Sequence, residues 1–140
     1  MKVLFDTNVV LDVLLDRPPF STPASLLFSH VESGGLKGYL GATTVTTIHY
    51  LATKQVGRSQ AKAYIGDLIK LFEVAPVNRL VLETALAGQL PDFEDAVLLA
   101  AAYHAGIDVL VSRNAKDFKN KLLPVHSPEQ LLRIMGDTDA

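Results

Sequence analysis

Cysteine and tryptophan are both absent from this chain of 140 residues, and aromatic residues make up only 7% of it. Without cysteine the chain can form no disulfide, no thiolate zinc site and no cysteine nucleophile. Any bound metal ion would therefore be held by oxygen or imidazole groups. The absence also fits a reducing compartment, which favours the cytoplasm.

A long apolar run is missing too. The most apolar stretch is interrupted by His104, Gly106 and Asp108, and too few apolar residues precede Asp6 for a signal peptide. We expect a cytoplasmic protein without a membrane segment. The chain also has no large excess of positive or negative charge, because the formal net charge is only −2. Any contact with nucleic acid would thus depend on a local basic patch.

What the chain does contain indicates a globular protein. Hydrophobic residues make up 49% and charged residues 20%, which excludes a disordered or fibrous chain. A length of 140 residues is enough for one compact core. We predict a single domain over residues 1–135, followed by a frayed tail over residues 136–140.

Hydrophobic periodicity alternates between strand and helix along the chain. This alternation predicts an α/β fold with three layers, in which helices cover both faces of a mainly parallel sheet. The predicted strands are 2–6, 38–41, 73–77 and 108–112. The predicted helices are 9–15, 21–32, 43–56, 59–72, 79–90, 92–105 and 127–135.

Acidic residues stand where several of these elements end or begin. Asp6 leaves the first strand, Asp95 lies in the first turn of a helix, and Asp117 follows the fourth strand. The carboxyl ends of parallel strands meet at one edge of a sheet, so these carboxylates can converge there. Like charges brought together need a cation, and carboxylates are preferred ligands of Mg²⁺ and Mn²⁺. Asn8 and Asn114 could add neutral oxygen ligands.

Other acids have simpler explanations. Asp92 is better explained as a helix cap, Glu94 as a solvated charge, and Asp12 could face either the cleft or solvent. Capping explains Asp6 less well, because a buried strand delivers it to the expected crevice. Further site candidates are Asp12, Thr47, Asp92 and Ser112.

Three segments together resemble the PIN domain family: Asp6 to Asp12, Asp92 to Val97, and Ser112 to Phe118. The resemblance implies a five-stranded parallel sheet and a ribonuclease that depends on Mg²⁺ or Mn²⁺. It also implies a homodimer and, for many members, the VapC-type toxin of a toxin–antitoxin pair. Asp6, Asp95 and the Asn114/Asp117 loop then correspond to the metal-binding acids, with Asn8 as their polar companion.

The chain departs from the family pattern at two places. Thr47 stands where the family usually has a second acid, and Asn114 stands at the usual place of the fourth, with Asp117 three residues later. This loss of negative charge leaves one alternative open. The chain could be a catalytically weak PIN-like module that binds RNA or a protein partner.

Basic residues crowd the loop beside Asp117. Arg113, Lys116 and Lys119 could contact the RNA backbone, although a solvated basic loop explains them equally well. A dehalogenase-like phosphatase also begins with an aspartate after its first strand. That class needs a second acid two residues later, where this chain has Asn8, which cannot act as a general acid.

Overall fold

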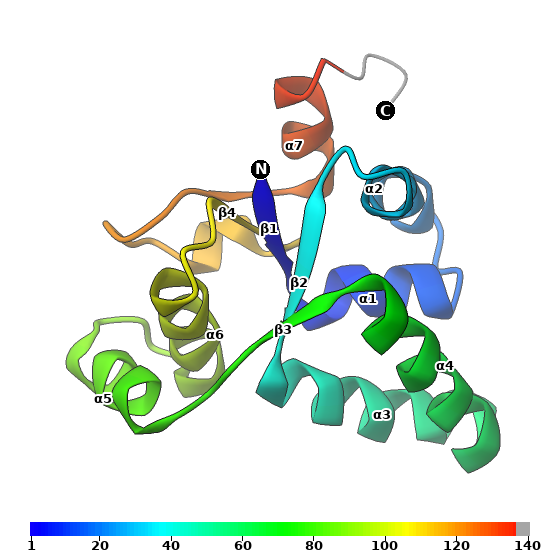
Figure 1. Cartoon of the computed structure of the whole chain (residues 1–140), viewed down its shortest axis with the longest axis horizontal. Helices are drawn as coiled ribbons and strands as arrows, with labels where there is room; N and C mark the ends of the chain where they lie inside the picture. The colour runs from blue at the N-terminus through cyan, green and yellow to red at the C-terminus, as the bar shows by residue number, and fades with distance from the viewer. Residues whose placement is uncertain (137–140) are drawn as a thin grey trace.

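The computed structural model describes residues 1–136, in which five strands form one sheet with every pairing parallel. The strand order is β3-β2-β1-β4-β5, and Figure 1 shows the helices packed around the sheet. The strands are β1 (Lys2–Phe5), β2 (Lys37–Gly41), β3 (Glu73–Ala75), β4 (Val109–Val111) and β5 (Val125–His126). The helices are α1 (Thr7–Leu14), α2 (Ser21–Glu32), α3 (Ala42–Val56), α4 (Arg58–Leu71), α5 (Arg79–Ala87), α6 (Phe93–His104), the short 3-10 helix η1 (Ala115–Asp117) and α7 (Pro128–Ile134).

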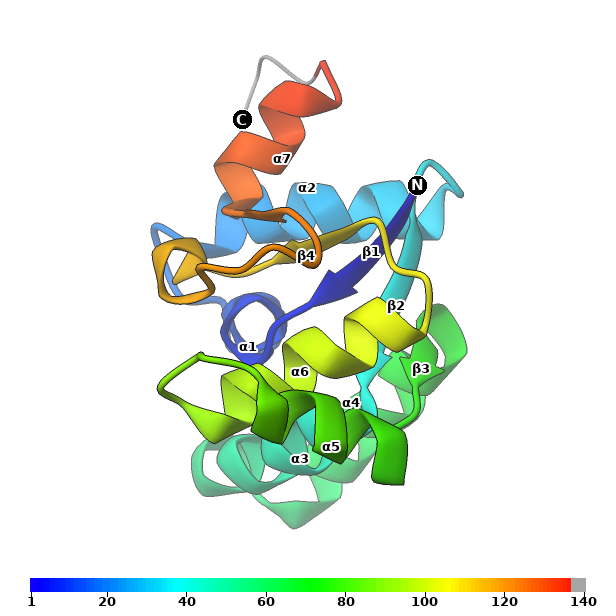
Figure 2. The ribbon, with the colours of Figure 1, turned by 90° about the vertical axis from the view of Figure 1, so that its left-hand side faces the viewer.

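The sheet separates two hydrophobic clusters. Val3 and Phe5 point into one cluster, together with α1, α2 and α7, whereas Leu4 points into the other, with α5 and α6. Alternate side chains of a strand face opposite sides of a sheet, so the three buried residues of β1, Val3 to Phe5, serve both clusters. Figure 2 shows α2 and α7 on one side and α5 and α6 on the other. The predicted three-layer α/β fold is therefore confirmed.

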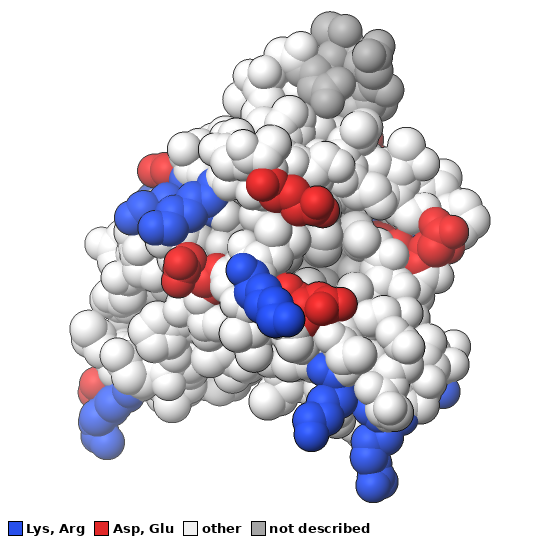
Figure 3. Space-filling model, turned by 45° about the vertical axis from the view of Figure 1, so that its right-hand side comes forward, with Lys and Arg blue, Asp and Glu red and all other residues white. Residues whose placement is uncertain are grey.

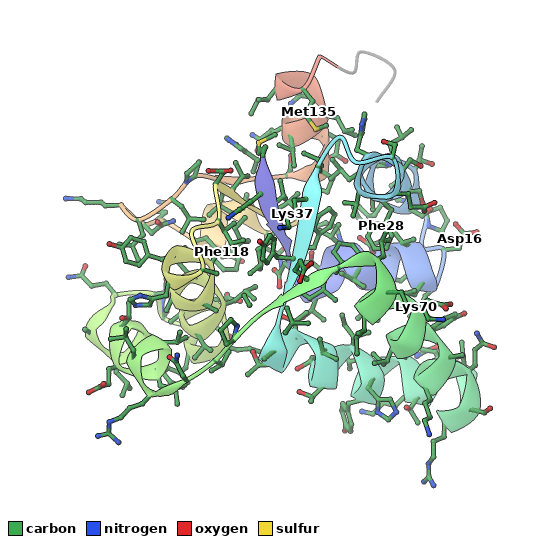
Figure 4. The ribbon with its side chains drawn as sticks, in the orientation of Figure 1. Asp16, Phe28, Lys37, Lys70, Phe118 and Met135 are labelled. Carbon is green, nitrogen blue, oxygen red and sulfur yellow. The ribbon has the colours of Figure 1, made fainter. Side chains whose placement is uncertain are left out.

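Three phenylalanine rings pack at the centre of the first cluster. Phe28 from α2, labelled in Figure 4, lies 5.6 Å from Phe5 and 5.1 Å from Phe72, in edge-to-face contacts between ring centroids. Gly38 of β2 leaves room for them, because a Cβ at this position would lie 2.6 Å from the Phe72 ring. The glycine is therefore required for close approach and not for a turn.

The strand order also places the crevice. From β1 the chain proceeds to β2 and β3 on one side, and it then returns to β4 and β5 on the other. The carboxyl ends of β1 and β4 thus flank the point where the order reverses, which is where open α/β sheets bind ligands. Among the described residues, no helix is long and apolar enough to cross a lipid bilayer.

Most predicted elements are present, with shifted ends. Asp6 caps α1 instead of ending β1, so the helix begins at Thr7, two residues earlier than predicted. α5 ends at Ala87 and not at residue 90. Ser127 caps α7 through a capping box with Gln130. Of the predicted frayed tail, residues 137–140 lie outside the described residues.

Two glycine substitutions test the packing. We expect Gly38→Ala to lower the free energy of unfolding by about 1–3 kcal/mol, because the new methyl group would overlap the Phe72 ring. Gly66→Ala in α4 is the matched control, since nothing lies within 4 Å of its Cβ position. It should raise stability by up to about 1 kcal/mol through helix propensity. Urea denaturation measures both, and equal effects would contradict the close packing.

Candidate active site

Asp6 lies between the ends of β1 and β4. Its carboxylate accepts a hydrogen bond of 2.7 Å from the Ser112 hydroxyl and another of 2.7 Å from the backbone N–H of Thr7. The side chain is almost entirely buried. Burial raises the pKa of Asp6, although both hydrogen bonds oppose the rise. The protein thus holds a costly buried carboxylate in a fixed orientation.

Ser112 and Asn8 organise the loop that follows β4. The Ser112 hydroxyl accepts the Asn114 backbone N–H at 3.0 Å and lies 3.4 Å from the Asn8 amide nitrogen. The side-chain oxygen of Asn8, Oδ1, accepts the backbone N–H of Arg113 at 3.2 Å. The structure therefore uses Asn8 to brace this loop against α1. The Asn114 side chain is exposed.

The N-terminus of α6 carries the second group of acids. Asp92 caps the helix by accepting the Asp95 backbone N–H at 2.9 Å, as the sequence predicts. Asp95 is half-buried in the first turn. Burial, followed by the negative charges of Asp92, Asp6, Asp117 and Glu94, raises the pKa of Asp95 to about 6. The part of this shift that is due to charge shows that carboxylates from three separate segments of the chain lie close to Asp95.

An open cleft of about 440 Å³ lies where these acids meet. Pro91, Asp92, Asp95 and Asp117 line it. Asp117 is exposed at the end of η1, whereas Asp6 lies deeper and interacts with Asp95 through its charge. Within residues 1–136, no three acidic or histidine side chains are close enough to form a ready-made metal site. The available ligands are hard carboxylate oxygens, and no group in residues 1–136 donates a hydrogen bond to the Asp95 or Asp117 carboxylate, so their chemistry fits a divalent cation.

Thr47 and Glu94 meet at the edge of this group. The Thr47 hydroxyl donates to the Thr43 carbonyl at 3.1 Å and lies 3.5 Å from a Glu94 carboxylate oxygen. Glu94 also raises the pKa of both Asp6 and Asp95 by charge repulsion. The Glu94 side chain is exposed, as the sequence suggests. It lies beside Thr47, where the family resemblance leads us to expect an acidic residue. Sequence reasoning missed this placement because residues 47 and 94 belong to different helices.

Asp12 is buried and paired with two arginines. Its two carboxylate oxygens lie 2.8 Å from the Nε atoms of Arg17 and Arg113, and its side chain is 1% exposed. The Arg113 guanidinium also lies over the Phe20 ring, 4.1 Å from its centroid. Asp12 therefore ties α1 to the loop after β4. Arg113, predicted to contact RNA, is largely engaged within the protein, whereas Lys116 and Lys119 are exposed.

The described contacts thus divide the predicted site residues into three sets. Asp92, Asp95 and Asp117 share the cleft, Asp6 borders it, and Ser112 with Asn8 and Asp12 supports the surrounding backbone. The Asp92 cap has a clear local signal in the sequence, whereas the contacts of Ser112, Asn8 and Asp12 with distant segments do not. The pairing of Asp12 with Arg17 crosses the C-terminal end of α1, where Asp16 has a φ of 47°, so helical spacing no longer predicts the contact.

Comparison with known proteins identifies relatives of the fold. The PIN domain family model matches residues 2–116. A DNA-bound VapBC structure from Salmonella typhimurium is similar, with a TM-score of 0.70 and 16% identity, over 91% of this chain and 98% of that one. A toxin–antitoxin complex from Klebsiella pneumoniae has a TM-score of 0.68 and 22% identity, over 90% and 97% of the two chains.

A third similar structure is VapC20 from Mycobacterium tuberculosis, described as a toxin that cleaves the sarcin–ricin loop. Its TM-score is 0.64 and its identity is 16%, over 77% of this chain and 86% of that one. No curated protein sequence matches this chain significantly. At these identities the structural neighbours establish the fold alone.

The buried ion pair gives the first prediction for the site. Asp12→Ala should lower the free energy of unfolding by about 1–3 kcal/mol, because it leaves two partly buried arginines without their buried partner. Arg79→Ala is the control, since its 3.8 Å pair with Glu83 is exposed and should contribute under about 1 kcal/mol. Urea denaturation compares them. Similar losses would show that the Asp12 pairs do not hold the loop.

The raised pKa of Asp95 gives a prediction for pH. Between about pH 4 and pH 6 the folded protein binds more protons at Asp95 than the unfolded chain does, because the folded pKa is about 6 and the ordinary value is 3.8. Stability must therefore fall as pH rises through this window. Asp95→Asn should flatten the fall and stabilise the protein above pH 6. Denaturation curves from pH 4 to pH 8 test this, and an unchanged slope in the variant would contradict it.

Proposed function

This chain belongs to the PIN domain family, and from that membership we propose that it is a metal-dependent endoribonuclease. It would hydrolyse RNA phosphodiester bonds with Mg²⁺ or Mn²⁺. We propose further that it acts in the cytoplasm as a homodimer and as the toxin of a toxin–antitoxin pair. The partner proposal rests on the similar structures, several of which are VapBC or toxin–antitoxin complexes.

One observation carries the nuclease proposal. Carboxylates from the junction of β1 and α1, from α6 and from η1 gather at the switch point of a parallel sheet, and burial together with their charges raises the pKa of Asp95 to about 6. No lysine or arginine forms an ion pair with Asp6, Asp95 or Asp117 among the described residues. The structure therefore concentrates negative charge that a divalent cation would neutralise.

We assign the metal ligands to Asp6, Asp95 and Asp117, with Asn8 and Asn114 nearby. A bound divalent cation would supply Lewis-acid activation of water and of the scissile phosphodiester. Ser112 would keep the Asp6 carboxylate oriented through its 2.7 Å hydrogen bond. Asn8 would hold the adjacent loop in place through the Arg113 backbone.

Glu94 offers a way to restore the acid that Thr47 lacks. Its carboxylate lies 3.5 Å from the Thr47 hydroxyl and interacts with the charges of Asp6 and Asp95. A glutamate has the reach to approach the cleft from the first turn of α6, while a threonine offers only a neutral hydroxyl. We therefore include Glu94 in the acidic set of the proposed nuclease.

Local lysines would bind the RNA backbone. On the face shown in Figure 3, acidic and basic side chains are interspersed over a mostly uncharged surface, with no broad basic area. Lys116 and Lys119 are exposed beside Asp117 on the loop after β4. Arg113 would contribute mainly by shaping this loop, since Asp12 and Phe20 hold its guanidinium.

Metal binding and RNA cleavage test the proposal together. The wild type should bind Mn²⁺ in calorimetry and cut RNA only when Mn²⁺ or Mg²⁺ is present. Asp6→Asn and Asp95→Asn should each abolish cleavage and weaken Mn²⁺ binding. Glu94→Gln should weaken Mn²⁺ binding by about tenfold, the effect of losing one supporting carboxylate.

Glu129→Gln is the matched control, because Glu129 also lies in the first turn of a helix but on α7. It should leave both measurements unchanged. Equal cutting without a divalent metal would refute the proposed chemistry. A folded wild type that binds RNA or a protein partner, but never cuts RNA, would establish the alternative of a binding module.

A further inference from the structure

A second cavity, of about 710 Å³, lies beside the acidic cleft and has no role in the chemistry proposed above. Its walls come from α5, α6 and the loop over residues 119–122, which lie on the left in Figure 1. Small and apolar side chains dominate the lining, among them Ala87, Leu90, Leu99 and Ala100. The alanines leave a space large enough for a ring system.

The cavity adjoins the cleft at three points along the chain. Leu90 lines the cavity and is followed by Pro91, which lines the cleft, and Ala96 of the cavity follows Asp95 of the cleft. The rim of the cavity includes Lys119, two residues after Asp117. A ligand at the acids would therefore extend readily into this space.

The loop at the rim is held in shape by Asn120. Its side-chain amide nitrogen donates to the Phe118 carbonyl at 2.7 Å, and its carbonyl oxygen accepts the backbone N–H groups of Leu122 at 2.7 Å and Leu123 at 3.0 Å. Phe118, labelled beside α6 in Figure 4, and Leu123 are both buried in the second hydrophobic cluster. The loop is thus anchored at both ends.

This anchored loop presents two positive charges at the cavity. Lys119 and Lys121 both line it, and both are exposed. Neither forms an ion pair among the described residues. Gln89 also lines the cavity, and its exposed side-chain amide has no hydrogen-bond partner among the described residues. An apolar floor with cationic groups and a free amide at its edge suits a flat ring attached to an anion.

We propose that this cavity binds one unpaired nucleobase of a single-stranded RNA, next to the phosphate held at the acidic cleft. The base would lie against the apolar floor, Lys119 and Lys121 would contact the flanking phosphates, and Gln89 would face the polar edge of the base. The inference rests on the proposed ribonuclease function and adds to it a binding subsite for one base in the cavity between α5, α6 and the loop over residues 119–122.

Two space-filling substitutions and one control test it. Ala87→Phe fills the cavity from its mouth and Ala100→Leu from its floor. Leu86→Phe is the control, because the adjacent Leu86 is 71% exposed and does not line the cavity. The probe is a fluorescein-labelled single-stranded RNA with Ca²⁺ in place of Mn²⁺ or Mg²⁺, so that a cation still neutralises the acids, and a gel checks that the RNA stays intact while anisotropy measures binding.

Both filling variants should bind this RNA about tenfold more weakly than wild type, the loss expected for one bound base, and Leu86→Phe should bind normally. A series of RNAs with a single abasic position adds a second readout. One abasic position should weaken wild-type binding by a similar factor and should not weaken Ala87→Phe further, because both changes remove the same contact.

Three results would overturn the inference. If both filling variants bind RNA normally while metal-dependent cleavage persists, the base lies elsewhere and the nuclease proposal stands. If the wild type neither binds nor cuts RNA, both proposals fail. If Ala87→Phe changes only the mass in sedimentation, or only the binding of a protein partner, the cavity belongs to a protein interface.

Discussion

The parallel pairing of β1 with β4 is the contact on which the candidate site depends. It aligns Phe5 with Val111, and the ladder continues where the Asp6 backbone N–H donates to the Val111 carbonyl at 2.9 Å. One residue further, the Ser112 hydroxyl reaches the Asp6 carboxylate. A slip of one residue would turn every side chain of β1 to the other face of the sheet, so burial of Val3, Leu4 and Phe5 also sets the position of Asp6.

The carboxylates at this edge of the sheet repel one another, and neighbouring groups offset part of that repulsion. Asp6 is buried and Asp95 carries a raised pKa, so neither carboxylate is stabilised by its position alone. Partial compensation comes from nearby fixed groups, namely the Ser112 hydroxyl and the N-terminal ends of α1 and α6. Such a local loss of stability is common at functional sites, where the residues present serve the chemistry of the site and not the stability of the fold.

Most of the fold could be predicted because its signals are local. Apolar runs and helical periodicity predict four of the five strands and every long helix, and the caps at Asp92 and Ser127 are visible as single residues before a helical pattern. The fifth strand was implied only by family resemblance. β5 pairs just Val125 and His126 with β4, and two residues are too few to show a period.

Local sequence patterns suffice to predict the alternation of strands and helices, the acids at their ends and the likeness to the PIN domain family, because each pattern lies within a short segment. Which distant groups meet follows only from the tertiary structure. It brought Glu94 to Thr47, closed both arginines on Asp12, and opened a cavity between α5, α6 and the Asn120 loop. These contacts join segments that are far apart in the sequence. Packing of the two hydrophobic clusters brings the segments together, and the spacing of residues along the chain does not reveal which of them will be in contact.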